Sequence, residues 1–497
     1  MIVLILLILV AVLCFLYLNG TYNENYWKKR GIPFYSKNKY LGPLFEFLYA
    51  KQPGFQIMQS IYKTHPEAPA VGVVSLFGRA LLIKDLTNVQ YVLATDFNSF
   101  SHRGMEINEG DILADSIIFN NGKRWKLMRQ HITPLFTSSK LKSMYYIIDK
   151  SAQDFIDYLK KNPQYLKGNA FETLSTFCSA AIGGSVFGVG TESIFDSPFL
   201  KMAQKASQFT LKMNFFFAIA NASPKISNFF GIKLFKEHEG FFIDAIKQII
   251  RARERENVKR HDFADICVSL QKNDVLKDHD TGLELKPTDE FLAAQAFFFF
   301  IAGVEPSATT MYITLIELGR HPEVLAKVHE EIDNTFEKHE NITHDVLCEM
   351  EYLDMAINEA MRLHPPIGFV SRQCVQDTVL PVGNIKIEKG TTMFIATYGM
   401  HHDETYFPEP NAFKPERFSK ENKHNFMDAA YMPFGKGNRI CIGVRYAQLQ
   451  VKAGLVHLLR NYTIRTILHD NEDEVKYKRE LVQLRVSNAD VEFIPRL

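Results

Sequence analysis

The sequence predicts a mainly α-helical fold with small β portions, an α+β class, and three observations support this. The chain has 497 residues and is 46% hydrophobic, which is enough to fill a large core. Its middle part has the periodicity of amphipathic helices, whereas short β-like runs occur towards the two ends, and we find no internal repeat. The helical examples are 154–161 and 238–256, and the β-like runs are 70–78, 80–84, 392–398 and 490–495.

The N-terminus predicts a retained membrane anchor. The segment 2–18 carries no charge and reaches the lower length limit for a membrane-spanning helix, about 17–25 residues. A cleaved signal peptide is the alternative, but no basic region precedes the apolar run and no small-x-small cleavage site closes it. Trp27 at the headgroup level, followed by Lys28, Lys29 and Arg30, predicts that the rest of the chain faces the cytoplasm.

The remaining chain is predicted to form one domain. We divide the sequence into an anchor at 1–20, a linker with a Gly/Pro hinge at 21–45, and a single catalytic domain at 46–497. Gly31, Pro33 and Pro43 mark the linker. The net charge of +1 argues against nucleic acid as a partner.

A long helix is predicted to begin after Thr288, whose hydroxyl can cap it, and to reach Gly319. It spans roughly thirty residues, or about 45 Å. Its first half is apolar on all sides, as in a helix that crosses a protein interior. A second membrane span is the rival interpretation, but Glu305 and Pro306 interrupt the apolar stretch too early for it.

The segment "FGKGNRICIG", residues 434–443, contains one of only six cysteines, which are widely spaced and form no CxxC pair. A buried free thiol is the simple interpretation of Cys441, and a metal-bound thiolate is the alternative. The start of the helix predicted at 444–458 would lower the pKa of the thiol. Gly437 and Gly443 would permit unusual backbone angles and close approach to a flat ligand, and Arg439 could pair with an acidic group on that ligand.

With Phe434, these residues form a pattern that resembles the haem signature of the cytochrome P450 haem-thiolate monooxygenases, and the resemblance covers essentially the whole chain after the anchor. It implies the cytochrome P450 fold, with haem b (iron protoporphyrin IX) between the central helix and the cysteine loop, and Cys441 as the iron ligand. Glu359-x-x-Arg362 resembles the family's ExxR motif, and Arg417 in "PERF" its partner. The resemblance implies a buried ion network among Glu359, Arg362 and Arg417.

Further haem contacts are implied on the same basis. Trp125 and Arg129 ("WKLMR") resemble the family's C-helix motif, and their spacing of four places both on one helix face, where they could clamp a haem propionate. Arg103 and Arg372 stand where related microsomal enzymes carry further propionate ligands. For each arginine, an ordinary solvated surface charge is the alternative.

The oxygen site is expected in the central helix, where Ala302-Gly303-Val304-Glu305-Pro306-Ser307 resembles the family's A/G-G-x-D/E-T-T/S motif. Small residues at 302 and 303 would leave room for dioxygen, and the acid and threonine of the family serve proton delivery. Here Pro306 replaces the threonine. Proline cannot bond to the carbonyl of Ala302, so that carbonyl could hold a water which, with Glu305 and Ser307, replaces the hydroxyl. A kink without a relay role is an equal alternative.

A largely apolar pocket is expected to take lipophilic substrates. By resemblance, it lies between the loop 105–119, one face of the central helix, 367–370 and 481–484. The segment 209–222 could dip into the bilayer or form a buried helix. The predicted pocket residues are Ile112, Ile118, Phe298, Ile301, Ile367, Val370 and Val482.

The expected activity is monooxygenation, with O2 as co-substrate. No flavin or dinucleotide site is visible, so the resemblance implies electrons from NADPH through NADPH–cytochrome P450 reductase, with cytochrome b5 as a second partner, at the endoplasmic-reticulum membrane. Lys123, Arg124, Lys126, Lys436 and Arg445 could steer an acidic partner. Two rivals stay open: a reductase-independent isomerase or dehydratase of lipid hydroperoxides, and a haem protein that binds ligands without turnover.

Overall fold

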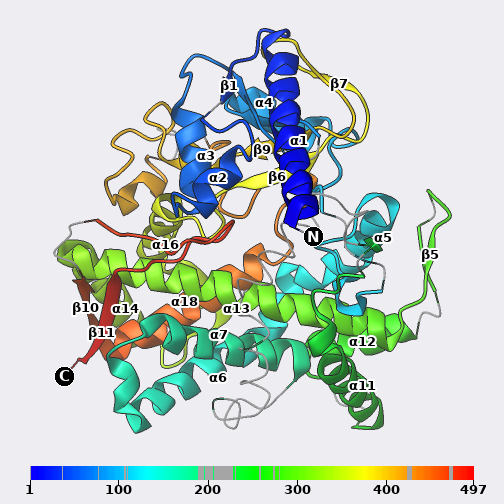
Figure 1. Cartoon of the computed structure of the whole chain (residues 1–497). Coiled ribbons are helices and arrows are strands. Elements are labelled where there is room, and N and C mark those ends of the chain that lie inside the picture. The colour runs from blue at the N-terminus through cyan, green and yellow to red at the C-terminus, as the bar shows by residue number, and fades with distance from the viewer. Residues whose placement is uncertain are drawn as a thin grey trace.

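The computed structural model describes residues 2–35, 37–75, 78–105, 108, 110–188, 195, 205, 228–229, 231–256, 259–272, 275–278, 280–422, 428–469 and 474–496. A sheet-rich part lies at the top of Figure 1 and a larger helical part below it. The predicted α+β class is confirmed. The segment 209–222, for which a membrane-dipping or buried helix was considered, lies outside the described residues.

The described α-helices are α1 Ile2–Lys28, α2 Pro43–Leu48, α3 Gly54–Lys63, α4 Leu86–Gln90, α5 Gly122–Ile132, α6 Ser138–Lys161, α7 Ala170–Phe187, α11 Glu239–Glu256, α12 Phe263–Gln271, α13 Asp289–Arg320, α14 Pro322–Lys338, α15 His344–Glu349, α16 Glu351–Leu363, α17 Thr397–His401 and α18 Val444–Asn461. Short helical turns include η2 Ile112–Ala114, η5 Lys236–His238, η6 Pro415–Phe418 and η8 Gly437–Arg439. The strands are β1 Phe34–Tyr35, β2 Ala70–Val73, β3 Ala80–Ile83, β4 Leu276–Lys277, β5 Glu284–Leu285, β6 Val370–Gln373, β7 Thr378–Leu380, β8 Ile385–Ile387, β9 Thr392–Ile395, β10 Tyr462–Leu468 and β11 Ala489–Pro495.

The predicted long helix is confirmed as α13, which crosses the helical part (Figure 1). The Thr288 hydroxyl accepts a hydrogen bond from the backbone N–H of Phe291 at 3.2 Å, so Thr288 caps the helix as expected. Nearly all of α13 between residues 291 and 318 is buried, as a core helix should be. The helix continues without a break through Pro306.

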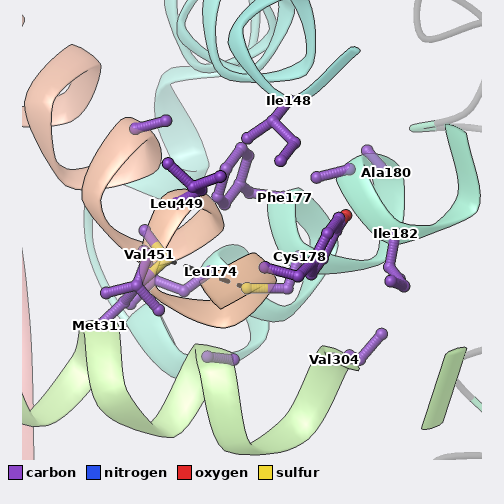
Figure 2. Packing of buried hydrophobic residues seen from close by; sticks show 14 of the residues in the cluster. Ile148, Leu174, Phe177, Cys178, Ala180, Ile182, Val304, Met311, Leu449 and Val451 are labelled. Atoms are coloured by element: carbon purple, nitrogen blue, oxygen red, sulfur yellow. Dashed lines mark hydrogen bonds between the residues drawn. The ribbon is translucent and has the colours of Figure 1, made fainter. Parts of the chain in front are cut away.

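Glycines bring α7, α13 and α18 into close contact. A Cβ on Gly303 of α13 would lie 2.9 Å from the Ile182 side chain of α7. A Cβ on Gly454 of α18 would lie 2.7 Å from Met311 of α13. Figure 2 shows the interdigitated apolar side chains of this region, with the sulfurs of Cys178 and Met311 3.9 Å apart. The three helices therefore form one tightly packed unit.

The largest sheet joins segments from distant parts of the sequence, in the order β1-β2-β3-β9-β6. β1 pairs with β2 in parallel and β3 with β9 in parallel, whereas β2–β3 and β6–β9 are antiparallel. β10 and β11 form a separate antiparallel pair, from Tyr462 opposite Pro495 to Leu468 opposite Ala489. The β-like runs predicted at both ends of the chain thus form β2, β3, β9 and β11.

The N-terminal apolar helix α1 has exposed side chains along most of residues 3–18, which fits a membrane anchor. The helix continues through residues 21–28 of the predicted linker. Trp27 was expected at the headgroup level, but it is fully buried, and a Cβ on Gly72 of β2 would lie 2.5 Å from its ring. Burying the indole against the sheet removes more apolar surface from water than a headgroup position would, and it fixes the end of α1 to the domain.

Candidate active site

The cysteine loop is shaped by its own backbone hydrogen bonds. The N–H of Cys441 donates to the carbonyl of Phe434 at 3.0 Å, and α18 begins directly after Gly443. Gly437 has φ 72°, and a Cβ there would overlap the carbonyl of Leu93, so the predicted need for glycine is correct. Gly443 has φ −91°, which any residue adopts, so the predicted special angle is wrong at this position. A Cβ on Gly443 would nevertheless meet no protein atom within 4 Å, which leaves room beside the sulfur for a flat group.

The Cys441 thiol has a pKa above its ordinary value, because burial outweighs the lowering by the Gly443 backbone N–H and by Arg103 and Arg129. The Gly443 N–H at the start of α18 contributes a lowering, as expected of a helix start, but burial outweighs it and the pKa is raised overall. The side chain is accessible although the loop around it packs into the domain. A thiol in this setting becomes a thiolate when a metal cation binds it.

Three of the arginines predicted to bind propionates, Arg103, Arg129 and Arg372, converge near this cysteine together with Arg439. Burial lowers the pKa of Arg372 to about 9, with a further contribution from Arg103. Burial also lowers the pKa of Arg103 and Arg129, and the charge of Cys441 acts in the opposite direction on both. The buried Nε atoms of Arg103 and Arg372 have no hydrogen-bond partner among the described residues. Arg372 and Arg439 are buried and Arg103 and Arg129 half-buried, and such a cluster of cations favours a bound anion.

Arg439 is committed mainly to protein contacts. It donates to the carbonyls of Ser101 and Asn120 at 3.0 Å each, and to the Asn121 side chain at 3.2 Å. Its guanidinium lies over the Trp125 ring, 4.1 Å from the centroid. Burial, followed by the neighbouring arginines, lowers its pKa to about 8. Arg439 therefore fastens the cysteine loop to residues 101–121 and to α5, and Trp125 packs against it.

One face of α13 is more accessible than the rest of this buried helix. Ala302 is exposed, and Gly303 and Pro306 are half-buried. The expectation that Ala302 leaves space is supported by this exposure. The expectation for Gly303 is corrected, because its missing side chain accommodates Ile182 of α7. Gly303 is thus a packing glycine, and Ala302 is the most accessible residue on this face.

The acid of this motif, Glu305, is buried and forms an ion pair with Arg485. It also accepts a hydrogen bond from the Gln483 side chain at 3.3 Å. Ser307 is buried beside it on α13. Both partners of Glu305 come from the segment that carries the predicted pocket residue Val482, and sequence reasoning did not find them, because more than 170 residues separate them from Glu305.

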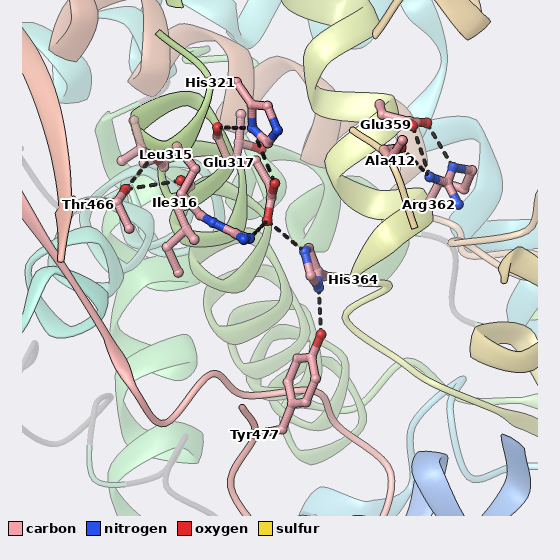
Figure 3. Close-up of polar contacts among 12 residues, drawn as sticks. Leu315, Ile316, Glu317, His321, Glu359, Arg362, His364, Ala412, Thr466 and Tyr477 are labelled. Carbon is pink, nitrogen blue, oxygen red and sulfur yellow. Dashed lines mark hydrogen bonds and ion pairs between the residues drawn. The ribbon is translucent and has the colours of Figure 1, made fainter. Parts of the chain in front are cut away.

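The predicted contacts of Glu359 with Arg362 and Arg417 are both present, and Figure 3 shows the pair Glu359–Arg362. Glu359 and Arg362 are fully buried and bonded at 2.8 and 2.9 Å, and Arg417 reaches Glu359 at 3.1 Å. Sequence reasoning missed His401, whose Nδ1 lies 3.1 Å from the Arg362 carbonyl while its Nε2 accepts from the N–H of Met432 at 3.0 Å. His401 therefore links the network to the segment that enters the cysteine loop.

A second buried polar chain lies next to this network in Figure 3. Glu317 near the end of α13 contacts His364 at 3.0 Å, and His364 contacts the hydroxyl of Tyr477 at 2.7 Å. Burial alone would raise the pKa of Glu317, but the hydrogen bond and charge of His364, with Arg320 and His321, lower it overall. The chain joins α13, α16 and the C-terminal segment.

The predicted pocket residues have two different settings. Phe298 and Ile301 are buried on α13, whereas the other predicted residues are half-buried: Ile112, Ile118, Ile367, Val370 and Val482. Val370 and Val482 pack against the core of the sheet-rich part. Phe235 was missed: its ring lies 5.1 Å from Phe298 and 6.0 Å from Phe119. No periodic pattern near residue 235 could have indicated that contact.

A flat iron-bearing group with acidic substituents fits these residues. Cys441 would supply a sulfur ligand, Gly443 leaves space beside it, and the Nε atoms of Arg103 and Arg372, which are unpartnered among the described residues, would match carboxylates. Fold and site together define a haem-thiolate protein.

The comparisons with known proteins agree. The family model for Cytochrome P450 matches residues 35–493. The chain is 33% identical to Cytochrome P450 6j1 of Blattella germanica over 478 residues, covering 93% of this chain and 92% of the relative. It is 31% identical to Probable cytochrome P450 6d4 of Drosophila melanogaster over 506 residues, covering 96% of each. It is 32% identical to Cytochrome P450 6B5 of Papilio glaucus over 471 residues, covering 92% and 97%. The chain belongs to the cytochrome P450 family.

Proposed function

We propose that the protein is a microsomal haem-thiolate monooxygenase that inserts one atom of O2 into lipophilic small molecules, such as xenobiotics, plant toxins, insecticides or endogenous lipids. Membership of the family supports haem monooxygenation in general. The observation that carries the proposal is the accessible Cys441 sulfur near Arg103 and Arg372, whose buried Nε atoms have no hydrogen-bond partner in the part of the chain that the structure describes. The insect relatives support a role in xenobiotic metabolism.

In this proposal Arg103, Arg129 and Arg372 bind the haem propionates, and Arg439 with Trp125 holds the loop in place. The Gly443 N–H reduces the charge on the sulfur of Cys441. Bound haem supplies the activation of dioxygen, and its thiolate ligand favours O–O cleavage. The protein contributes orientation, exclusion of water and a route for protons.

For the proton route, we propose a water held at the Ala302 carbonyl, with Glu305 and Ser307 as further members. Pro306 has no N–H for that carbonyl, and Ala302 is exposed on an otherwise buried helix. The ion pair with Arg485 holds the Glu305 side chain in place. Pro306→Thr should leave the product formed per NADPH consumed nearly unchanged. A large gain in that ratio would show that the native arrangement is a poor relay and that Pro306 only shapes the helix.

The proposed electron source is NADPH through NADPH–cytochrome P450 reductase, with cytochrome b5 as a second donor, at the endoplasmic-reticulum membrane. We retain an anchor at 1–20, a linker at 21–45 and one catalytic domain at 46–497. Lys123 and Arg445 are exposed and suited to an acidic partner. Arg124 and Lys126 are paired with Asp115 and Asp280 in the structure, and they contribute less free charge.

The proposal is tested with the full-length holoenzyme in lipid vesicles. Lipophilic compounds that shift the haem spectrum should be oxidised when NADPH and the reductase are both present, and omission of either should stop turnover. A fatty-acid hydroperoxide that is converted without NADPH would instead favour the isomerase or dehydratase. Binding without any turnover would favour a ligand-binding protein.

A further inference from the structure

Two buried carboxylates join the pocket loop to the start of α11 in a crossed arrangement. Asp111, just before η2, accepts hydrogen bonds through Oδ2 from the N–H groups of Leu234 at 2.5 Å and Phe235 at 3.2 Å. Glu239, the first residue of α11, accepts through Oε1 from the N–H of Ile112 at 3.1 Å. Each segment therefore supplies one carboxylate to the backbone of the other. Asp111 is 2% exposed and Glu239 is 5% exposed.

Charged side chains and backbone donors act on both carboxylates of this joint. Lys236 pairs with Glu239 at 2.6 Å, and Lys233 is the cation that acts on Asp111. Burial raises the pKa of Asp111, the two backbone donors lower it, and the charge of Glu239 raises it further. The Oδ1 atom of Asp111 is buried without a hydrogen-bond partner among the described residues. Three backbone N–H donors therefore hold the two buried carboxylates, with Lys236 and Lys233 as the nearby cations.

The joint fixes a wall of the proposed pocket. Ile112 and Ile118 belong to the loop held by Asp111, and the N–H of Ile117 donates to Gln295 of α13 at 3.1 Å. On the other side, Phe235 contacts Phe298 of α13. When the crossed bonds are broken, the loop keeps its attachment to α13 but is released from α11.

We propose that Asp111 and Glu239 form a latch that positions the loop 110–119 against the start of α11 and sets how fast ligands enter and leave the haem pocket. The proposal rests on the proposed function, since it assumes that this loop borders a haem pocket. Both are positioning residues, because neither is argued to touch the substrate.

The first test uses amide hydrogen exchange in the wild-type holoenzyme. One opening event breaks both contacts of a crossed latch. The amides of Ile112, Leu234 and Phe235 should therefore exchange at rates that agree within about threefold, once each rate is divided by the intrinsic exchange rate of that amide. Exchange at Ile112 that is more than tenfold faster than at Leu234 would mean that the two contacts open independently, which would overturn the proposal.

The second test measures the binding of 4-phenylimidazole to the ferric haem by stopped-flow absorbance. Asp111→Asn and Glu239→Gln each remove a charge that strengthens these bonds, so association and dissociation should both accelerate about three- to tenfold. The Kd should change less than twofold, because the latch is closed in both the free and the bound state. Glu237→Gln, an exposed acid on the same turn, is the matched control and should change neither rate.

The outcomes separate this proposal from the proposed function. The latch proposal would be overturned if both variants bound and released 4-phenylimidazole at the wild-type rates. It would also be overturned if the Kd changed because only association or only dissociation was affected. Neither result would contradict the haem site itself. Absence of a thiolate-type spectrum in the reduced carbon monoxide complex of the wild-type protein would overturn the proposed function first. The amide-exchange comparison needs no variant, so it applies even where a latch variant fails to fold.

Discussion

Arg362→Lys tests whether the buried network holds the domain around the cysteine loop. Arg362 donates five hydrogen bonds: two to Glu359, and one each to the carbonyls of His401, Pro410 and Ala412, at 2.7–3.1 Å. Lysine keeps the charge but has only three N–H donors on one atom. At least two acceptors around the fully buried Arg362 side chain therefore lose their partner. Glu359 and the His401 carbonyl are buried, and the carbonyls of Pro410 and Ala412 are part-buried.

Each unsatisfied buried acceptor costs about 1–3 kcal/mol, so the variant should lose about 2–6 kcal/mol. This is a large part of the roughly 5–15 kcal/mol that stabilises a typical domain. The assay is urea unfolding of the holoenzyme, followed by haem absorbance and by far-ultraviolet circular dichroism. We expect a clearly lower midpoint by both probes.

The matched control is Arg465→Lys, which changes the same side chain at an exposed ion pair with Glu492. Exposed pairs contribute little, so its midpoint should stay near that of the wild type. If Arg362→Lys unfolded at the wild-type urea concentration, the geometric match of the guanidinium to these acceptors would not be what stabilises the site.

Two further predictions concern the loop and the end of α13. Gly437→Ala should sharply reduce haem incorporation, because the positive φ of Gly437 and the nearby carbonyl of Leu93 exclude a Cβ. Gly443→Ala should reduce haem incorporation less, since a Cβ there meets no protein atom within 4 Å. Equal haem incorporation in the two variants would refute this reasoning. The lowered pKa of Glu317 implies stability that is present above its unfolded value near 4.5 and lost as the pH falls below it. Glu317→Gln should therefore be less stable than the wild type at pH 7, and it should lose less stability between pH 5 and pH 3. Urea titration at each pH measures both effects. If the free energies of unfolding of variant and wild type ran parallel across this pH range, the pairing with His364 would be contradicted.

Periodicity and a capping residue predicted the fold class and the central helix, whereas the buried network was predicted from the resemblance of the ExxR and "PERF" segments to a known family. Glu359 and Arg362 lie on one turn of α16, so their contact follows from helix geometry. The reason for a small residue was harder to predict, because Gly303 fits both an open oxygen site and a close helix contact, and only the position of Ile182 decides between them.

Contacts between distant segments that carry no family motif could not be predicted from the sequence. Glu305 with Arg485, and Asp111 with Phe235, are brought together by the tertiary fold, and no periodicity encodes such pairs. The pKa of Cys441 was misjudged for a related reason. The helix start was visible in the sequence, but the larger effect of burial depends on how the whole loop packs.

The central claim is that Cys441 is the thiolate ligand of a haem held by the arginine cluster. The most direct measurement is the absorbance spectrum of the reduced carbon monoxide complex of the full-length protein, beside that of Cys441→His. The wild type should give the long-wavelength band of thiolate ligation, and the variant should bind haem but give the shorter-wavelength band of histidine ligation. A wild-type spectrum without the thiolate band, or a variant that retains it, would contradict the assignment.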